Sequence, residues 1–264
     1  AAALTKNNTV GLITGRFNID GKGFDVNTLT LKTKSTISSI EITGKTINNL
    51  FVDGMLSKKQ YNGIFNINDE EAKGKIEGKI DFSTKRLLAD INGKIDYLNL
   101  SYFGVPGNGK SVFTGNVKGK IAFTNVNDMN LDANLNNVVF FAGDQKIDIP
   151  DGSLKAFFED GKRVVAVDMP NVVRGNISGK YNLGDLGGMF QNGINKILVG
   201  NPERKYFKGQ EFNYIFEVNQ QLVNYFEPNL KIPEGARING SFNGSTNDLV
   251  LNADATSIKY IMLK

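Results

Sequence analysis

Apolar and polar residues alternate in a nine-residue pattern that occurs five times along the chain. The clearest copy is Gly74–Phe82, which reads G-K-I-E-G-K-I-D-F, and the others begin at Gly11, Gly115, Gly175 and Ala236. Alternation with a period of two residues is typical of a β-strand that has one apolar and one polar face. Each copy therefore predicts a strand. The polar face of the clearest copy, which we expect to face water, carries Lys75, Glu77, Lys79 and Asp81.

Glycines recur on the apolar face of these predicted strands. Six of them occupy matching positions in three of the copies: Gly74, Gly78, Gly115, Gly119, Gly175 and Gly179. A glycine inside a strand weakens a packed core, but it lets the strand bend or lets another group approach the sheet closely. We therefore expect these glycines to shape a curved sheet rather than to act as ordinary turn residues.

The rest of the chain continues the alternation in short segments separated by polar turns. Examples are the predicted strands 12–19, 29–33, 36–43 and 151–159, the last of which follows Pro150. About eighteen such segments at even spacing are typical of an all-β chain. Because the repeated pattern extends over the whole length, we predict one elongated, repeat-built segment over residues 1–264 that belongs to a longer protein.

One stretch departs from this alternation and predicts a short amphipathic helix over residues 186–198, inserted at 185–199. Its apolar residues have the i, i+3, i+4 spacing of a helix and are Leu186, Met189, Phe190, Ile194, Ile197 and Leu198. Asp185 is placed to cap its start, and Gly200 and Pro202 are placed to end it. Three internal glycines each cost about 1 kcal/mol relative to alanine. Such a helix needs a partner surface for its apolar side.

Composition narrows the chemistry. The chain has no Cys, His or Trp, which removes thiol nucleophiles, disulfides and the commonest general base and metal ligand. Its net charge is +4, but the lysines are spread singly along polar strand positions, whereas a nucleic-acid site normally needs a cluster. No apolar run approaches the roughly 18–20 residues of a membrane helix. We expect no enzyme activity, cofactor, metal or nucleic-acid partner.

Residues 104–111 read G-V-P-G-N-G-K-S and match the phosphate-binding loop pattern G-x-x-x-x-G-K-[ST]. That motif works because the loop opens a helix whose N-terminal N–H groups hold phosphates. Here the Lys-Ser pair leads into an alternating strand instead. The sequence therefore predicts a surface loop and no bound nucleotide.

The alternating apolar faces leave several structures open. Two sheets could bury them against each other as a β-sandwich core. A ligand-lined groove or a solenoid could use the same pattern. The glycines on the apolar face and the recurrence of the copies over the whole chain favour a curved sheet in a linear stack.

Three stretches resemble the repeated units of the TamB/AsmA-like family: Gly74–Leu100, Val164–Leu198 and Leu222–Gly244, the last with its L-K-I-P-E-G segment. The resemblance implies a β-taco, a long twisted sheet whose curled face forms an apolar groove. It also implies a periplasmic location between the inner and outer membranes of Gram-negative bacteria and a role in phospholipid transport, without covalent chemistry. An outer-membrane assembly barrel protein would be a partner through parts outside this segment.

The resemblance implies that the apolar strand faces line a lipid groove and bind phospholipid acyl chains. The residues so assigned are Ile13, Phe17, Ile76, Ile80, Phe82, Leu87, Ile91, Ile95, Val117, Ile121, Phe123, Leu131, Leu135, Ile177, Tyr181, Phe212, Tyr214, Phe216, Phe242, Leu249 and Leu251. The helix would act as a plug in the groove or as a cap at an end. Two other functions remain open: a scaffold for outer-membrane protein assembly that uses exposed strand edges, and a solenoid without a ligand.

Overall fold

The structure is a computed structural model that describes residues 10–23, 25, 27–42, 44–103, 110–143, 145–200, 206–226, 229–254 and 259–260. Most of these residues form antiparallel strands, and two α-helices accompany them. By its internal contacts the chain divides into two compact units. Unit 1 consists of residues 1–122 and 135–146, and unit 2 of residues 123–134 and 147–264.

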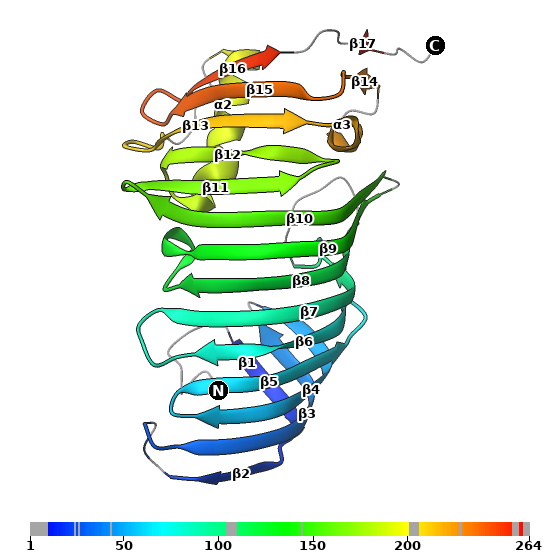
Figure 1. The fold of residues 1–264 in the computed structure, drawn as a ribbon, viewed down its shortest axis with the longest axis vertical. Helices are drawn as coiled ribbons and strands as arrows, with labels where there is room; N and C mark the ends of the chain where they lie inside the picture. Colours follow the sequence, from blue (N-terminus) through cyan, green and yellow to red (C-terminus); the bar gives the residue numbers. More distant parts are fainter. Residues whose placement is uncertain are drawn as a thin grey trace. The chain divides into compact units, whose positions relative to one another are not determined.

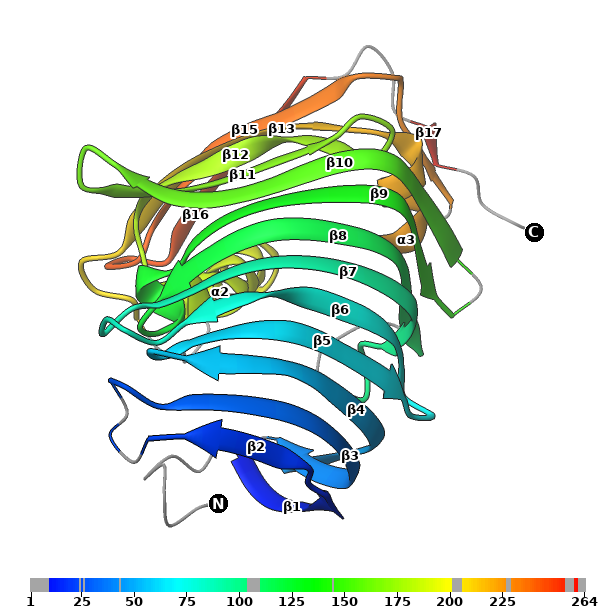
Figure 2. The ribbon, with the colours of Figure 1, turned by 60° about the horizontal axis from the view of Figure 1, so that its bottom comes forward.

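Unit 1 contains the strands of the first half of the chain. They are β1 (Val10–Arg16), β2 (Ile19–Lys22), β3 (Thr30–Ile42), β4 (Lys45–Ser57), β5 (Gln60–Asn68), β6 (Ala72–Asp81), β7 (Leu87–Asn99), nearly all of β8 (Ser111–Phe123) and the later part of β9 (Asn130–Ala142). The long strands of this unit bend along their length (Figure 2).

Unit 2 contains the first part of β9, the remaining strands and all the described helices. Its elements are the 3-10 helix η1 (Val126–Asp128), most of β10 (Gln145–Glu159), β11 (Lys162–Met169), β12 (Val173–Lys180), the 3-10 helix η2 (Leu183–Asp185), α2 (Leu186–Val199), β13 (Glu211–Val218), α3 (Gln220–Phe226), β14 (Leu230–Lys231), β15 (Ala236–Asn243), β16 (Asp248–Asp254) and β17 (Lys259–Tyr260).

Strand order in the sheet follows the order of the chain. One sheet of 15 strands runs β1-β3-β4-β5-β6-β7-β8-β9-β10-β11-β12-β13-β15-β16, with β2 beside β3, and β14 pairs separately with β17 (Figure 1). The all-β curled sheet with a short helix is thereby confirmed. Neighbouring strands are joined by short turns, because antiparallel strands allow tight hairpins.

Three local predictions were wrong. The stretch 12–19 is interrupted at Phe17 and Asn18, so it forms β1 and the start of β2. The two strands predicted between 29 and 43 are one continuous strand, β3. Pro150 does not precede a strand but lies inside β10, whose paired register with β11 begins only at Ser153. A proline lacks the N–H of a ladder hydrogen bond, so its place in a strand is where that bond is dispensable.

The recurring glycines combine an unusual backbone conformation with a close approach to the neighbouring strand. The first glycine of three copies has a positive φ: +157° at Gly74, +140° at Gly115 and +150° at Gly175. L-residues that carry a side chain rarely adopt such φ values. The second glycine lies against the neighbouring strand: a Cβ at Gly78 would collide with the carbonyl oxygen of Asp90, and one at Gly179 with that of Glu211. That these glycines shape the curvature of the sheet stays a prediction.

Polar side chains join the strand ends along one side of unit 1. The carboxylate of Asp69, which is only 5% exposed, accepts hydrogen bonds from the backbone N–H of Asn48 at 2.8 Å and of Glu71 at 2.7 Å. Tyr102, after β7, donates its hydroxyl to the carbonyl oxygen of Thr46 in β4 at 2.9 Å. These bonds span the ends of β4 to β7 and hold the strands in register.

Candidate functional site

An apolar face runs across β5, β6 and β7 of unit 1. The antiparallel register places Tyr61 and Phe65 of β5 opposite Ile80 and Ile76 of β6. The next strand places Ile91 opposite Gly78. Side chains that face one another across an antiparallel pair are direct neighbours, so the alternation of each strand adds up to one continuous apolar surface.

The described helices α2 and α3 both belong to unit 2, so unit 1 has no described helix of its own to lie over this face. The predicted lining residues of unit 1 are accordingly half-buried rather than buried, and they are Ile13, Ile76, Ile80, Leu87, Ile91, Ile95, Val117, Ile121 and Leu135. Phe17 and Phe82 are more open still, at 53% and 48% exposed. We call the surface formed by Tyr61, Phe65, Ile76, Ile80, Ile91 and Ile95 the open face.

Two aromatic residues of the open face were missing from the sequence prediction. Tyr61 and Phe65 lie on it with their ring centroids 5.3 Å apart. Their segment Tyr-Asn-Gly-Ile-Phe alternates in the same way as the five copies and carries Gly63 between the two rings. A search for the alternation alone, without the first glycine, would have found them.

The other face of the same strands is polar, as predicted. Lys75 and Lys79 are exposed, and Glu77 and Asp81 are half-buried. The Nζ of Lys75 lies 3.4 Å from the Glu77 carboxylate, and Asn92 donates a hydrogen bond to Glu77. Ion pairs this exposed contribute at most about 1 kcal/mol each, so they keep this face in water without fixing the fold.

The matching face of unit 2 is covered by α2. The helix crosses the strands β12, β13, β15 and β16 (Figure 1). Met189 is fully buried, and the ring of Phe190 packs on Phe212 with centroids 5.1 Å apart and on Tyr214 at 5.7 Å. Phe212 in turn stacks on Phe242 of β15 at 5.4 Å. Helix and sheet together form a hydrophobic core cluster in this unit.

Most of the predicted lining residues of unit 2 therefore lie in a covered core. Buried ones are Ile177, Tyr181, Phe212, Tyr214, Phe242 and Leu249. Phe123, Leu131 and Phe216 are half-buried, and Leu251, on the edge strand, is 53% exposed. We call the surface formed by the six buried residues the covered face.

The helix itself agrees with its prediction in extent but not in its cap. It spans Leu186–Val199 and ends at Gly200, whose φ is +87°, but the side chain of Asp185 makes no capping hydrogen bond. Of the predicted plug residues, Leu186, Met189 and Phe190 pack against the sheet, whereas Ile194 and Ile197 are 45% and 59% exposed. The side chain of Leu198 lies outside the described residues.

Burial also changes two titratable groups beside the covered face. It raises the pKa of Tyr181 to about 12, because the apolar surroundings disfavour the phenolate, and the nearby Arg163 opposes this only in part. Arg163 is 1% exposed and burial lowers its pKa. Its Nη1 donates to the carbonyl oxygen of Met129 at 3.0 Å, its Nη2 to that of Asn127, and its guanidinium lies 4.3 Å from the Phe158 ring centre. Through these hydrogen bonds, Arg163 of β11 holds η1 and the residue after it against that strand.

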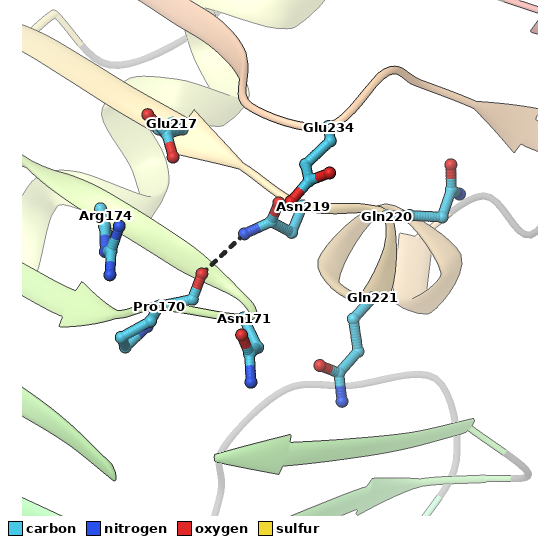
Figure 3. Close-up of a pocket in the computed structure, with 8 residues that line it drawn as sticks. All are labelled: Pro170, Asn171, Arg174, Glu217, Asn219, Gln220, Gln221 and Glu234. Atoms are coloured by element: carbon cyan, nitrogen blue, oxygen red, sulfur yellow. Dashed lines mark hydrogen bonds between the residues drawn. The ribbon is translucent and has the colours of Figure 1, made fainter. Parts of the chain in front are cut away.

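A polar cavity of about 500 Å³ lies beside α3 in unit 2 (Figure 3). Its lining residues are Pro170, Asn171, Arg174, Glu217, Asn219, Gln220, Gln221 and Glu234, none of which the sequence singled out. Asn219 donates its amide to the carbonyl oxygen of Pro170 at 2.8 Å. Arg174 is paired with Asp168 at 3.0 Å and Glu217 faces Arg237 at 3.8 Å, so opposite charges are already matched around it.

The phosphate-loop match falls mainly on residues 104–109, which lie outside the described residues. The strand predicted to follow it is confirmed, since β8 begins at Ser111. Among the described residues, no cluster of acidic side chains is arranged to hold a metal ion. Within that same part of the chain, no helix combines the length and apolar character that crossing a membrane requires.

Comparisons of the chain with family models, with curated proteins and with solved structures give no match.

Proposed function

We propose that the protein binds phospholipid acyl chains on the open face of unit 1 and acts as a segment of a conduit that carries phospholipid between two membranes. The observation that supports this most is the contrast between the two faces. The same repeated pattern is covered by α2 in unit 2, but it has no described helix over it in unit 1. A broad apolar face that remains partly exposed is a typical docking surface for an apolar ligand.

The physical chemistry of the open face suits an acyl chain. Such a chain has no hydrogen-bonding groups and gains about 0.8 kcal/mol for each methylene removed from water. Isoleucine side chains and the rings of phenylalanine and tyrosine offer contact area without demanding a specific partner. Glycines lie opposite Ile91 and Ile95, and because they have no side chain they leave shallow depressions in the apolar surface. The phosphate head group would remain in water, where single lysines attract it weakly.

The wider setting of this proposal comes from the resemblance to the TamB/AsmA-like family. On that basis we place the protein in the periplasm, between the inner and outer membranes, with an outer-membrane assembly barrel protein as a partner of the longer chain. Transport of this kind needs no covalent step, which agrees with a chain that contains no Cys or His.

Native mass spectrometry of the purified chain, after mixing with phosphatidylethanolamine and phosphatidylglycerol vesicles, tests this function. We expect bound phospholipid on the wild-type chain and at least a tenfold loss in Ile80→Asp, because a buried carboxylate opposes an apolar ligand. The matched control is Lys75→Asp, on the opposite face of the same strand and across from Lys94. A lipid-free wild type, or equal lipid loads in the two variants, would contradict the proposal.

A second candidate, a scaffold for outer-membrane β-barrel proteins, is favoured by the last strand of the sheet order. Among the described residues, β16 pairs only with β15, and its Val250 and Leu251 are 49% and 53% exposed. An exposed strand edge can accept a further strand from another chain. Binding of an unfolded barrel segment that is lost on substituting Val250 by proline, without bound lipid, would support this candidate over the conduit.

A further inference from the structure

The helix α2 occupies a surface that the repeat makes equivalent to the open face. In the copy Gly175–Leu183, Ile177 and Tyr181 stand where Ile76 and Ile80 stand in the copy Gly74–Phe82. Ile177 and Tyr181 are 9% and 8% exposed under α2, whereas Ile76 and Ile80 are half-buried. The apolar side of α2 therefore occupies the covered face of unit 2.

We propose that the covered face is a second acyl-chain site and that α2 is its displaceable occupant, which leaves the sheet when a lipid chain takes its place. This inference rests on the proposed function, since it assumes that the open face binds the same ligand. It adds a regulated site: lipid on the covered face competes with a segment of the chain itself.

The sheet under α2 does not depend on the helix for its backbone hydrogen bonds. The ladder runs without interruption from β12 through β13 and β15 to β16, with Gly179 opposite Phe212, Phe212 opposite Phe242 and Phe242 opposite Leu249. In the described part of unit 2, α2 is tied to these strands by side chains. Removing the helix would expose apolar rings but leave the ladder paired, and an acyl chain could cover those rings again.

The helix is also weak by its own sequence. It has 14 residues, and isolated helices of this length are marginal in water. It contains Gly187, Gly188 and Gly193, and its first residue lacks a side-chain cap. Two of its apolar residues, Ile194 and Ile197, are exposed to solvent. Its apolar packing on the sheet thus comes mainly from Leu186, Met189 and Phe190.

The two ends of α2 are held differently, which indicates how it would move. At the start, the Asp185 carboxylate accepts hydrogen bonds from Gln210 at 2.8 Å and from Asn182 at 3.2 Å. Toward the end, Lys196 Nζ lies 2.6 Å from the Asp248 carboxylate and donates to the carbonyl oxygen of Thr246 at 2.7 Å. This second contact is an exposed ion pair, so we infer that the helix opens from the Lys196 end about η2.

Two identical substitutions in α2 should shift this opening in opposite directions. At Gly187 an added Cβ meets nothing within 4 Å, so Gly187→Ala only favours the helix, by up to about fivefold, the factor that about 1 kcal/mol gives. At Gly193 an added Cβ would lie 2.5 Å from the Cβ of Leu249, so Gly193→Ala wedges the helix off the sheet. Gly184→Ala, also in open space but before the helix, is the neutral control.

Hydrogen exchange of the full chain without lipid reads this opening directly. In the wild type, we expect the amides of α2 to exchange faster than those of β12, β13 and β15. Relative to the wild type, the α2 amides should exchange more slowly in Gly187→Ala, by up to about fivefold, and faster in Gly193→Ala. If α2 exchanged only together with the strands in all variants, it would be a permanent part of the core and the inference would be overturned. This readout does not depend on whether any lipid binds.

Photolabelling then tests the ligand. The chain is mixed with vesicles of phosphatidylethanolamine and phosphatidylglycerol that contain a phosphatidylcholine with a diazirine in one acyl chain, and labelled peptides are mapped. Labelling of the covered face should rise in Gly193→Ala and fall in Gly187→Ala, while labelling of the open face stays constant. In the variant Lys196→Cys with Asp248→Cys, whose two thiols are the only ones in the chain, a bismaleimide link should abolish labelling of the covered face alone.

The outcomes separate the two ideas. The open face could be labelled while labelling of the covered face stays the same in all these variants. That result would overturn the second site and keep the proposed function. No labelling of the open face would reject the proposed function, and the exchange experiment would still decide whether α2 opens.

Discussion

The covered face of unit 2 and the open face of unit 1 are built from the same repeated pattern, yet only one of them is a core. In both, an alternating strand carries two glycines and is paired antiparallel with a strand of large apolar residues. In unit 2 the partner strand carries aromatic rings at Phe212, Tyr214 and Phe216, and α2 lies over two of them. In unit 1 the partner β7 carries Ile91 and Ile95, and no described helix of that unit lies over them.

This difference shows that the alternation specifies a face but not what covers it. A face with a dedicated helix gains burial within the chain and contributes to stability. A face without one retains apolar surface that a ligand can remove from water. The following predictions test whether the two faces differ in this way, beginning with the largest expected effect.

The truncation of one apolar side chain on each face should give unequal losses of stability. Phe212→Ala in the covered face removes a side chain that is 2% exposed and contacts Tyr181, Phe190 and Phe242, so we expect the free energy of unfolding to fall by about 3–5 kcal/mol. Ile80→Ala in the half-buried open face should cost about 1–2 kcal/mol. Urea unfolding followed by circular dichroism measures both. Equal losses would mean that the two faces are packed alike.

Alkaline pH should weaken the covered face through Tyr181. Its pKa of about 12 in the folded protein lies above the usual value near 10 of an unfolded chain. The unfolded state therefore loses the phenolic proton first, and stability present below pH 10 is lost as the pH rises toward 12.

At about 1.4 kcal/mol per pH unit, the loss that Tyr181 contributes is at most about 2.7 kcal/mol. The measurement is urea unfolding between pH 9 and pH 12 for the wild type and for Tyr181→Phe, which lacks the titrating group. As the pH rises, the free energy of unfolding of the wild type should fall relative to that of Tyr181→Phe. A difference that does not change with pH would show that Tyr181 is not buried in the folded state.

Glycine positions that touch the neighbouring strand should be intolerant of a methyl group in either unit. Gly78→Ala would push a Cβ into the carbonyl oxygen of Asp90, and we expect a loss of about 1–3 kcal/mol. Gly93, on the same face of the adjacent strand, has its nearest atom at 3.5 Å, so Gly93→Ala should change stability by less than about 0.5 kcal/mol. Thermal unfolding of the two variants compares them. Similar effects would mean that close approach of the strands is not the reason for the repeated glycine.

Charged pairs on the polar surface should matter least. Asp168→Asn removes the partner of Arg174, whose side chain is 51% exposed, and we expect a change below about 0.5 kcal/mol that decreases further with added salt. Urea unfolding at low and high ionic strength checks this. A loss above 1 kcal/mol would show that the polar surface contributes to the difference between the units.

Local regularities of the fold could be predicted because they depend on near neighbours in the chain. The alternation at Gly74–Phe82 indicated β6 and its apolar face, and helical spacing indicated α2 within one residue of its observed end. A continuous β3 was missed because polar residues around Ser35 resemble a turn, although Ser35 is 2% exposed inside the strand.

Contacts between distant segments could not be predicted in the same way. The packing of Phe190 on Phe212 depends on where a helix lies on a sheet, and periodicity contains no information about that position. The buried Arg163 gave no sequence signal either, since it stands in an ordinary polar position and is buried by the carbonyl groups of a distant 3-10 helix. Asp185 had the right residue type for a cap, but its carboxylate binds Gln210 and Asn182 instead.

The most direct test of the difference between the faces is site-specific photo-crosslinking to phospholipid. A photoreactive amino acid is placed at Ile80, Ile95 or Ile121, at Tyr214 on the covered face, and at Lys75 on the polar face as a control. In cells that express the protein, we predict lipid adducts at Ile80, Ile95 and Ile121, few at Tyr214 and none at Lys75. Adducts that are absent from all three isoleucine positions, or equally frequent at Lys75, would contradict the account.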